Sequence, residues 1–328
     1  MNTEPIETTD KVTEYAPLLD GNPVCYLLLY LGVPSNVPAS PSESHIKNTA
    51  SAKRSGKKMG VKIWSMRLLW ENGEGYLRYF FRLPRYSRDD ELAVRVGESA
   101  LYAMSVSSGP YLEEYQTLSV FRIPAEIVRG EECVGIEKLV QIEEARVPDD
   151  RITDYPAGTL RAARFCSSAA VDEAWRIAPA IFHSESLYHA ARFLKASSDQ
   201  FYIAPGQIDE VLRQPDLKAE TGSEQTQMEN ALQNAFKAVE AVIGDPSKDD
   251  RKFFPKLKAV GLHPMGKVDY RTKTPIHQVI RDMNLARDKK SAHGSTSDRM
   301  ISVCELMEYQ ACARHVLLSA IEKELGKN

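Results

Sequence analysis

The spacing of hydrophobic residues along this chain changes from strand-like to helical between about residues 145 and 169. Before the change, short apolar runs rich in β-branched and aromatic residues are separated by Gly, Pro and Asn, a pattern typical of strands and turns. The predicted strands are Val24–Leu31, Val61–Trp70, Tyr76–Leu83, Leu101–Val106, Leu118–Ile123 and Val134–Ile142. A short link containing Asn72 and Gly73 joins the second and third runs, which predicts a hairpin.

From Ala169 onward, apolar residues recur every three or four positions, as on the buried side of a helix. The strongest case is Glu224–Ile243, which Gly244 ends. One stripe of this helix is formed by Met228, Leu232, Ala235, Val239 and Val242. The other predicted helices near the C-terminus are Asp249–Val260, Pro275–Ala292 and Arg299–Leu325.

One long segment of the N-terminal part, Pro34–Gly60, lacks either period. It is rich in Pro, Ser, Asn and Ala, and its basic cluster consists of Lys53, Arg54, Lys57 and Lys58. Such a composition offers few large apolar side chains to bury. We therefore predict a mobile loop over residues 34–60.

Together these patterns predict an α+β protein with two domains. Residues 1–165 are expected to form a mixed, strand-rich α+β domain that senses a trigger or regulates the rest of the chain. Residues 166–328 are expected to form an all-helical domain. The chain has 328 residues, enough for two separate cores.

The charge is small in total but unevenly spread. The net charge is −3, yet Gly244–Met300 holds 13 Lys and Arg against 7 Asp and Glu. This local excess fits either a surface that attracts a polyanion or an ordinary solvated helix surface. The acidic start of the chain predicts no secretory signal, and the apolar run Val24–Val33 is too short to span a bilayer. Five scattered cysteines without metal-ligand spacing favour a reducing cytoplasm and predict no metal site.

The main candidate catalytic residues lie in the stretch Asn284–Gly294. It places Arg287 six positions before His293, with Asp288, Lys289 and Lys290 in between. An arginine can hold a phosphate through its planar fork of donors, and a neutral histidine can accept a proton near pH 7. This pair can attack a phosphodiester without a metal ion.

This stretch resembles the signature of the HEPN superfamily. The signature has an arginine, a polar residue directly after it and a histidine four to six positions later, and it lies between two amphipathic helices. The nearest variety is the ApeA-like or Abi-type domain of prokaryotic defence systems. The resemblance covers about residues 224–328 and implies a helical bundle that pairs into a homodimer, with the site in a cleft between the copies. It also implies a metal-independent endoribonuclease without a cofactor, acting on RNA such as tRNA in phage defence or abortive infection.

The resemblance assigns a role to each residue of the motif. His293 would act as the base on a ribose 2′-hydroxyl, and Arg287 would stabilise the charge on the phosphorane. Asp288 would orient either side chain, and Lys289 and Lys290 would hold neighbouring phosphates. Glu240, late in the preceding long helix, is a candidate to hold Arg287 in place, although an ordinary surface ion pair explains it equally well.

A straight helix would not bring the two catalytic candidates together. Positions six apart are separated by about 240° around a helix axis, because each residue turns by about 100°. Arg287 and His293 converge only if the helix ends near Ala292, or if two copies of the chain juxtapose their motifs.

Other interpretations stay open at this level. An arginine and a histidine near a helix end also complement the helix dipole and its carbonyls without any catalytic role. The helical part is then a noncatalytic dimerisation or binding module, or the chain is a sensor whose ligand or regulatory protein binds the N-terminal domain. His315, on the last predicted helix, is an alternative partner for the motif.

Overall fold

A computed structural model describes most of the chain. It covers residues 24–32, 42–71, 74–82, 90–107, 118–124, 128–129, 132–133, 140–141, 168–201, 208–268, 274–291 and 301–326. Side chains are described over residues 50–63, 92, 94–107, 172–201, 211–268, 274–287 and 301–326.

The chain divides into two compact units. The first comprises Met1–Leu101 and Glu114–Pro179, and the second comprises Tyr102–Glu113 and Ala180–Asn328. The two changes between units fall inside helices α3 (Asp90–Ser107) and α4 (Ser168–His183). The predicted domain boundary after residue 165 lies outside the described residues and stays a prediction.

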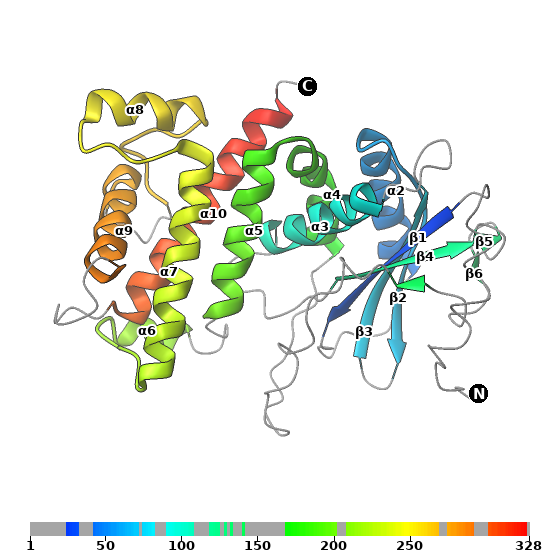
Figure 1. Cartoon of the computed structure of the whole chain (residues 1–328), viewed down its shortest axis with the longest axis horizontal. Coiled ribbons are helices and arrows are strands. Elements are labelled where there is room, and N and C mark those ends of the chain that lie inside the picture. The colour runs from blue at the N-terminus through cyan, green and yellow to red at the C-terminus, as the bar shows by residue number, and fades with distance from the viewer. Residues whose placement is uncertain are drawn as a thin grey trace. The chain divides into compact units, whose positions relative to one another are not determined.

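The backbone of the first unit places five strands in one sheet, in the order β2-β3-β1-β4-β7 (Figure 1). Neighbouring strands are antiparallel, so Leu28 lies opposite both Tyr79 and Val120. The strands are β1 (Val24–Gly32), β2 (Lys62–Glu71), β3 (Glu74–Arg82), β4 (Leu118–Pro124) and β7 (Val140–Gln141). A separate pair is formed by β5 (Val128–Arg129) and β6 (Glu132–Cys133).

The prediction of a strand-rich α+β N-terminal domain is wrong. Among the residues whose side chains are described as well as their backbone, 78% are helical, and only one short piece of strand and no complete sheet fall within them. Helices occur in the N-terminal part where the sequence pattern indicated a loop and a strand. The protein is therefore mostly helical.

The first of these helices is α2 (Ser42–Lys58), in the segment predicted to be a mobile loop. Within residues 50–58, the part of α2 whose side chains are described, the buried residues are the small Ala52, Ser55 and Gly56. A Cβ atom at Gly56 would meet the side chain of Ile63 at 2.8 Å, so the helix backbone approaches β2 very closely. The Ser55 hydroxyl donates to the Trp175 carbonyl of α4. The loop prediction failed because small residues bury a helix without the large apolar stripe on which it relied.

The second is α3, which replaces the strand predicted at Leu101–Val106. Short apolar runs fit a buried helix and a buried strand equally well, so periodicity does not separate them. In the second unit, the Tyr102 ring packs edge-on against Tyr188 with centroids 5.4 Å apart. Ala103, Met104 and Val106 are at most 1% exposed.

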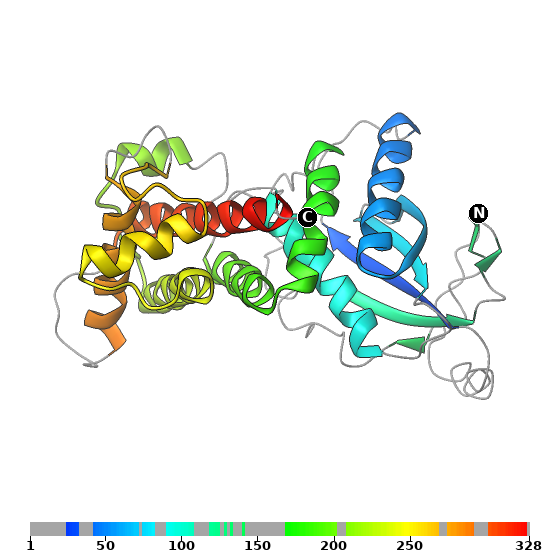
Figure 2. The same ribbon diagram turned by 90° about the horizontal axis from the view of Figure 1, so that it is seen from above.

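The second unit is a bundle of helices. Its remaining members are α5 (Glu185–Gln200), α6 (Ile208–Arg213), α7 (Gly222–Ile243), α8 (Asp250–Ala259), α9 (Ile276–Ser291) and α10 (Val303–Leu325). The four predicted C-terminal helices are thereby confirmed to within a few residues. Figures 1 and 2 show α10 running alongside α5 and α7.

A buried polar link fixes three helices of this bundle. The Ser197 hydroxyl of α5 donates to the Ala231 carbonyl of α7 at 2.6 Å. The Gln310 amide of α10 donates to the Ser197 and Phe201 carbonyls at 3.2 Å. Because an unpaired polar group would be costly here, these bonds define how the three helices align.

Candidate active site

The candidate arginine lies on the half of α9 that faces the bundle. Ile276, Val279, Ile280 and Met283 are each at most 2% exposed and form the inner stripe of this helix. Arg287 follows Met283 by four positions, about one turn, and so continues the same stripe. Its side chain is half-buried. The helix period therefore directs this arginine toward α7, where it stays half-buried.

Arg287 stacks on an aromatic ring of α7. Its guanidinium carbon lies 4.0 Å from the centroid of Phe236, whose side chain is fully buried. A cation over a ring face is attracted by the ring quadrupole, and the attraction increases when water is excluded. A planar guanidinium held in this way is oriented by its face, while its N–H donors point outward within the plane.

Sequence analysis did not identify Phe236 as part of the site. It assigned the supporting role to Glu240, which lies one turn further along α7 and is half-buried. The backbone carbonyl of Glu240 accepts from Gly244 at 2.7 Å where the helix ends. A carboxylate contact to Arg287 stays a prediction. The useful signal was the spacing of four between Phe236 and Glu240, which puts both on one side of α7.

The rest of the motif is described only in part. Asp288, Lys289 and Lys290 belong to the end of α9, but their side chains lie outside the described part of the structure. His293 lies beyond the described residues, since α9 is described as far as Ser291. Their predicted roles, and the approach of His293 to Arg287, remain predictions.

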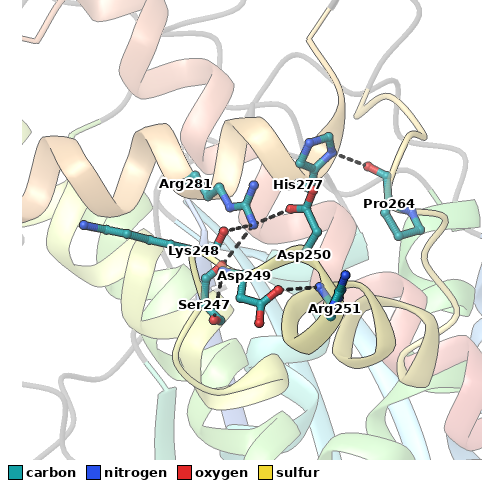
Figure 3. A network of polar contacts seen from close by, with 8 residues as sticks. All are labelled: Ser247, Lys248, Asp249, Asp250, Arg251, Pro264, His277 and Arg281. Carbon is teal, nitrogen blue, oxygen red and sulfur yellow. Dashed lines mark hydrogen bonds and ion pairs between the residues drawn. The ribbon is translucent and has the colours of Figure 1, made fainter.

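A second arginine fixes the other half of α9 (Figure 3). The Arg281 guanidinium donates to the Ser247 and Lys248 carbonyls at 3.1 and 3.0 Å and to the Asp250 carboxylate at 2.6 Å. It also lies 5.4 Å from the ring centroid of Phe253. These contacts fasten α9 to the link between α7 and α8. They position the helix that carries Arg287.

The first turn of α9 is fixed to the segment that follows α8. His277 Nδ1 lies 2.9 Å from the Pro264 carbonyl, toward which its ring points in Figure 3. The same ring packs edge-on against Phe254 of α8, with centroids 5.1 Å apart. His277 therefore has a structural role at this contact.

The candidate histidine on α10, His315, is half-buried. Burial lowers its pKa, and the neighbouring Arg314 charge lowers the pKa further. Arg314 is engaged by the C-terminal end of α3, since it donates to the Val106 and Ser107 carbonyls at 2.6 and 3.1 Å. A lowered pKa keeps His315 neutral near pH 7, as a proton acceptor requires. Its approach to Arg287 stays a prediction.

The contact region of α9 and α10 carries negative charge. Burial raises the pKa of the Glu308 carboxyl on α10, and the carboxylates of Asp282 on α9 and Glu305 raise it further. The Asp282 carboxylate accepts from the Gln278 amide at 2.8 Å. The acidic groups disfavour an anionic ligand on this side of α9.

Among the described residues, no group of three or more His, Cys, Asp or Glu side chains is arranged to hold a metal ion. None of the described helices is both long enough and apolar enough to cross a bilayer.

Known proteins offer no independent guide to this arrangement. The resemblance to the HEPN superfamily rests on the stretch Asn284–Gly294 and on the helices around it, and it stays a prediction. Comparisons with protein-family models, curated proteins and solved structures found no match to this chain.

Proposed function

We propose that this chain is an endoribonuclease of the HEPN type that cleaves RNA without a metal ion. The observation that carries the proposal is Arg287, held over the Phe236 ring at 4.0 Å near the end of α9. A catalytic arginine must present its donors in a defined plane, and stacking on a buried ring supplies that orientation.

The proposed reaction uses the ribose 2′-hydroxyl as nucleophile. His293 takes the hydroxyl proton while the 2′-oxygen forms a bond to the adjacent phosphorus. The bond from phosphorus to the 5′-oxygen breaks, and this oxygen leaves as a hydroxyl after taking up a proton. The products are a 2′,3′-cyclic phosphate and a free 5′-hydroxyl. Arg287 stabilises the extra negative charge on the phosphorane, and DNA does not react because it lacks the 2′-hydroxyl.

Asp288, Lys289 and Lys290 support this chemistry in the proposal. Asp288 orients Arg287 or His293, while the two lysines bind phosphates on either side of the cleaved bond. Glu240 helps to hold Arg287 from α7. The RNA is tRNA or another structured cellular RNA, and the physiological setting is phage defence or abortive infection in the cytoplasm. The N-terminal part responds to a trigger or a regulatory protein.

We also propose that two copies of the helical unit form the complete site. One motif presents one arginine and one histidine, whereas a symmetric pair places two sets along one cleft. Light scattering on the purified chain should give the mass of a dimer. A monomer with full activity would refute the paired site.

The decisive experiment incubates the purified chain with total RNA and with tRNA in the presence of a chelator, followed by end-group analysis. We expect cyclic phosphate and 5′-hydroxyl ends. His293→Ala should lower cleavage by about 100-fold or more, the scale for loss of a general base, while RNA binding persists. Arg192→Ala, an exposed change on α5, serves as the control and should keep the wild-type rate.

Two outcomes would contradict the proposal. One is loss of all cleavage in chelator with recovery on addition of magnesium or manganese. The other is wild-type cleavage by a folded His293→Ala variant. The motif would then be structural, and a noncatalytic binding module or a ligand sensor would become the better description.

A further inference from the structure

Three of the exposed side chains of α8 are basic. Phe253 and Leu257 are fully buried and fix which side of this helix faces inward. Arg251, Lys252 and Lys258 lie on the other side and are exposed. These three residues are called the α8 basic face below.

The acidic residues at the start of α8 are engaged within the protein. Asp249 accepts a hydrogen bond from the Arg251 backbone N–H at 3.0 Å and caps the helix. Asp250 forms the ion pair with Arg281 at 2.6 Å (Figure 3). Asp249 thus accepts from a backbone N–H, and Asp250 pairs with an arginine of α9.

Helix stability does not explain the placement of these charges. Cations stabilise the last turn of a helix and destabilise the first turn, because the helix dipole is positive at its N-terminus. Lys256 and Lys258 lie in the last turn, as this rule favours. Arg251 and Lys252 lie in the first turn, where the same rule disfavours them. A partner that is negatively charged accounts for two cations in an unfavourable position.

Lys256 and Lys323 have a different role from the α8 basic face. Lys256 Nζ donates to the Asp245 carbonyl at 2.7 Å, after the end of α7. Lys323 Nζ of α10 donates to the Ala259 carbonyl, at the end of α8. Both ammonium groups therefore satisfy backbone carbonyls near helix ends. The side chains of the α8 basic face are exposed on the surface of the helix.

We propose that the α8 basic face binds the phosphate backbone of RNA and guides the strand toward Arg287. The choice of RNA rests on the proposed function. The contacts of Asp250 with Arg281 and of Phe254 with His277 fasten α8 to α9, which carries Arg287. His277 precedes Arg287 by ten residues, or about 15 Å along a helix, a distance that a short stretch of RNA spans.

The chemistry of the face defines the kind of binding. Lysine and arginine contacts to phosphates position a strand without reading its bases, so binding should depend little on sequence. The affinity should fall steeply with salt, because each neutralised phosphate releases counterions. The acidic groups around Glu308 belong to α9 and α10 and not to α8.

The test compares two triple variants of the full chain in a His293→Ala background, so that bound RNA stays intact. One carries Arg251→Gln, Lys252→Gln and Lys258→Gln. The matched control carries Arg192→Gln, Arg213→Gln and Lys218→Gln, three exposed positions elsewhere in the same unit. Both sets remove the same charge. Fluorescence anisotropy measures the binding of a labelled single-stranded RNA over a range of salt concentrations.

The face variant should bind RNA about tenfold or more weakly at low salt. The slope of log affinity against log salt should become shallower by about 2, since each phosphate contact on single strands contributes about 0.7. The control should stay within about twofold of the parent. Circular dichroism should show the same helix content in all three proteins.

Three results would overturn the inference. Equal losses of RNA affinity in both variants would show that total charge, and not the α8 basic face, determines binding. Absence of RNA binding by the parent would show that RNA is not the ligand. Binding to phosphatidylserine vesicles in place of RNA, lost in the face variant, would assign the face to a membrane. Failure of the proposed function would give a different result. RNA would still bind through the α8 basic face, but the chain with His293 intact would not cleave it.

Discussion

Helix α9 carries two arginines that each lie over a buried phenylalanine ring, at 5.4 Å for Arg281 and 4.0 Å for Arg287. Arg281 is held by oxygen atoms, two carbonyls and one carboxylate, between 2.6 and 3.1 Å. Arg287, six residues later, is held over the ring of Phe236. Bonds to oxygen occupy the donors of a guanidinium, whereas stacking engages its face. Under the proposed function, Arg281 fastens α9 to its neighbours and Arg287 contacts the RNA.

The largest effect should come from removing the ring beneath each arginine. Phe236 and Phe253 are both fully buried, so replacing either with alanine should lower the free energy of unfolding by about 3–5 kcal/mol. Urea denaturation measures the loss. If the comparison is right, cleavage per folded molecule should fall strongly in Phe236→Ala and weakly in Phe253→Ala. Equal losses of activity in the two variants would contradict it.

Removal of the arginines themselves should separate activity from stability. Arg287→Ala should lower cleavage by about 100-fold, equivalent to about 2.7 kcal/mol of transition-state stabilisation. Arg287→Lys should not restore the rate, because an ammonium group does not reproduce a two-pronged hold on phosphate oxygens. Arg281→Ala should cost less than tenfold. Initial rates on one RNA substrate provide the measurement, and a larger loss for Arg281→Ala would reverse the assignment.

Arg281→Ala should affect the free energy of unfolding more clearly than it affects activity. Arg281→Ala removes a charge-assisted bond and two carbonyl bonds, so it should lower the free energy of unfolding by about 2 kcal/mol. The side chain of its partner Asp250 is 56% exposed, which keeps the loss moderate. Arg192→Ala, on the exposed side of α5, should stay within about 0.5 kcal/mol of wild type. If Arg281→Ala lowers the free energy of unfolding as little as this control does, the contacts of Arg281 are not needed for stability.

The smallest effect concerns the acidic contact between α9 and α10. The raised pKa of Glu308 means that the folded protein holds this proton more tightly than the unfolded chain does. This contribution to stability is present at low pH and is lost as the pH rises through the raised pKa. Glu308→Gln should therefore stabilise the protein at pH 7, by less than about 1 kcal/mol because the side chain is partly solvated.

A pH series of unfolding experiments tests this prediction. The gain from Glu308→Gln should shrink as the pH falls and disappear below about pH 3, where the wild-type carboxyl is protonated in both states. Glu220→Gln, a change at an exposed carboxylate, should give no such dependence on pH. A gain that persists at low pH would assign the effect to packing and not to charge.

The sequence by itself determined the C-terminal helices. Their apolar stripes repeat over several turns, and their ends carry local signals such as Thr221 and Ser302, whose hydroxyls accept from Glu224 and Glu305. Gly244, with φ of 69°, adopts the left-handed conformation that ends α7. Such signals act within a few residues, so they can be recognised in the chain alone. The same period placed Arg287 on the inner stripe of α9.

The N-terminal helices depended on contacts that local sequence does not encode. Ala52, Ser55 and Gly56 form a helix surface only because Ile63 and Trp175 lie against it. The apolar run Leu101–Val106 is compatible with helix or strand until its neighbours are known. Tertiary packing made the choice in both segments, because the free energy of burial exceeds the small differences in local propensity.

The candidate site shows the same division. Local sequence identified Arg287 by its type, its spacing to His293 and its place near the end of a helix. Only the tertiary structure brought it over Phe236, which lies 51 residues earlier, and held Arg281 against Asp250. These partners come from other helices, so their identity depends on how α7, α8 and α9 pack. Residue type and period can be read along one chain segment, but the surroundings that orient a guanidinium are created by the meeting of distant segments.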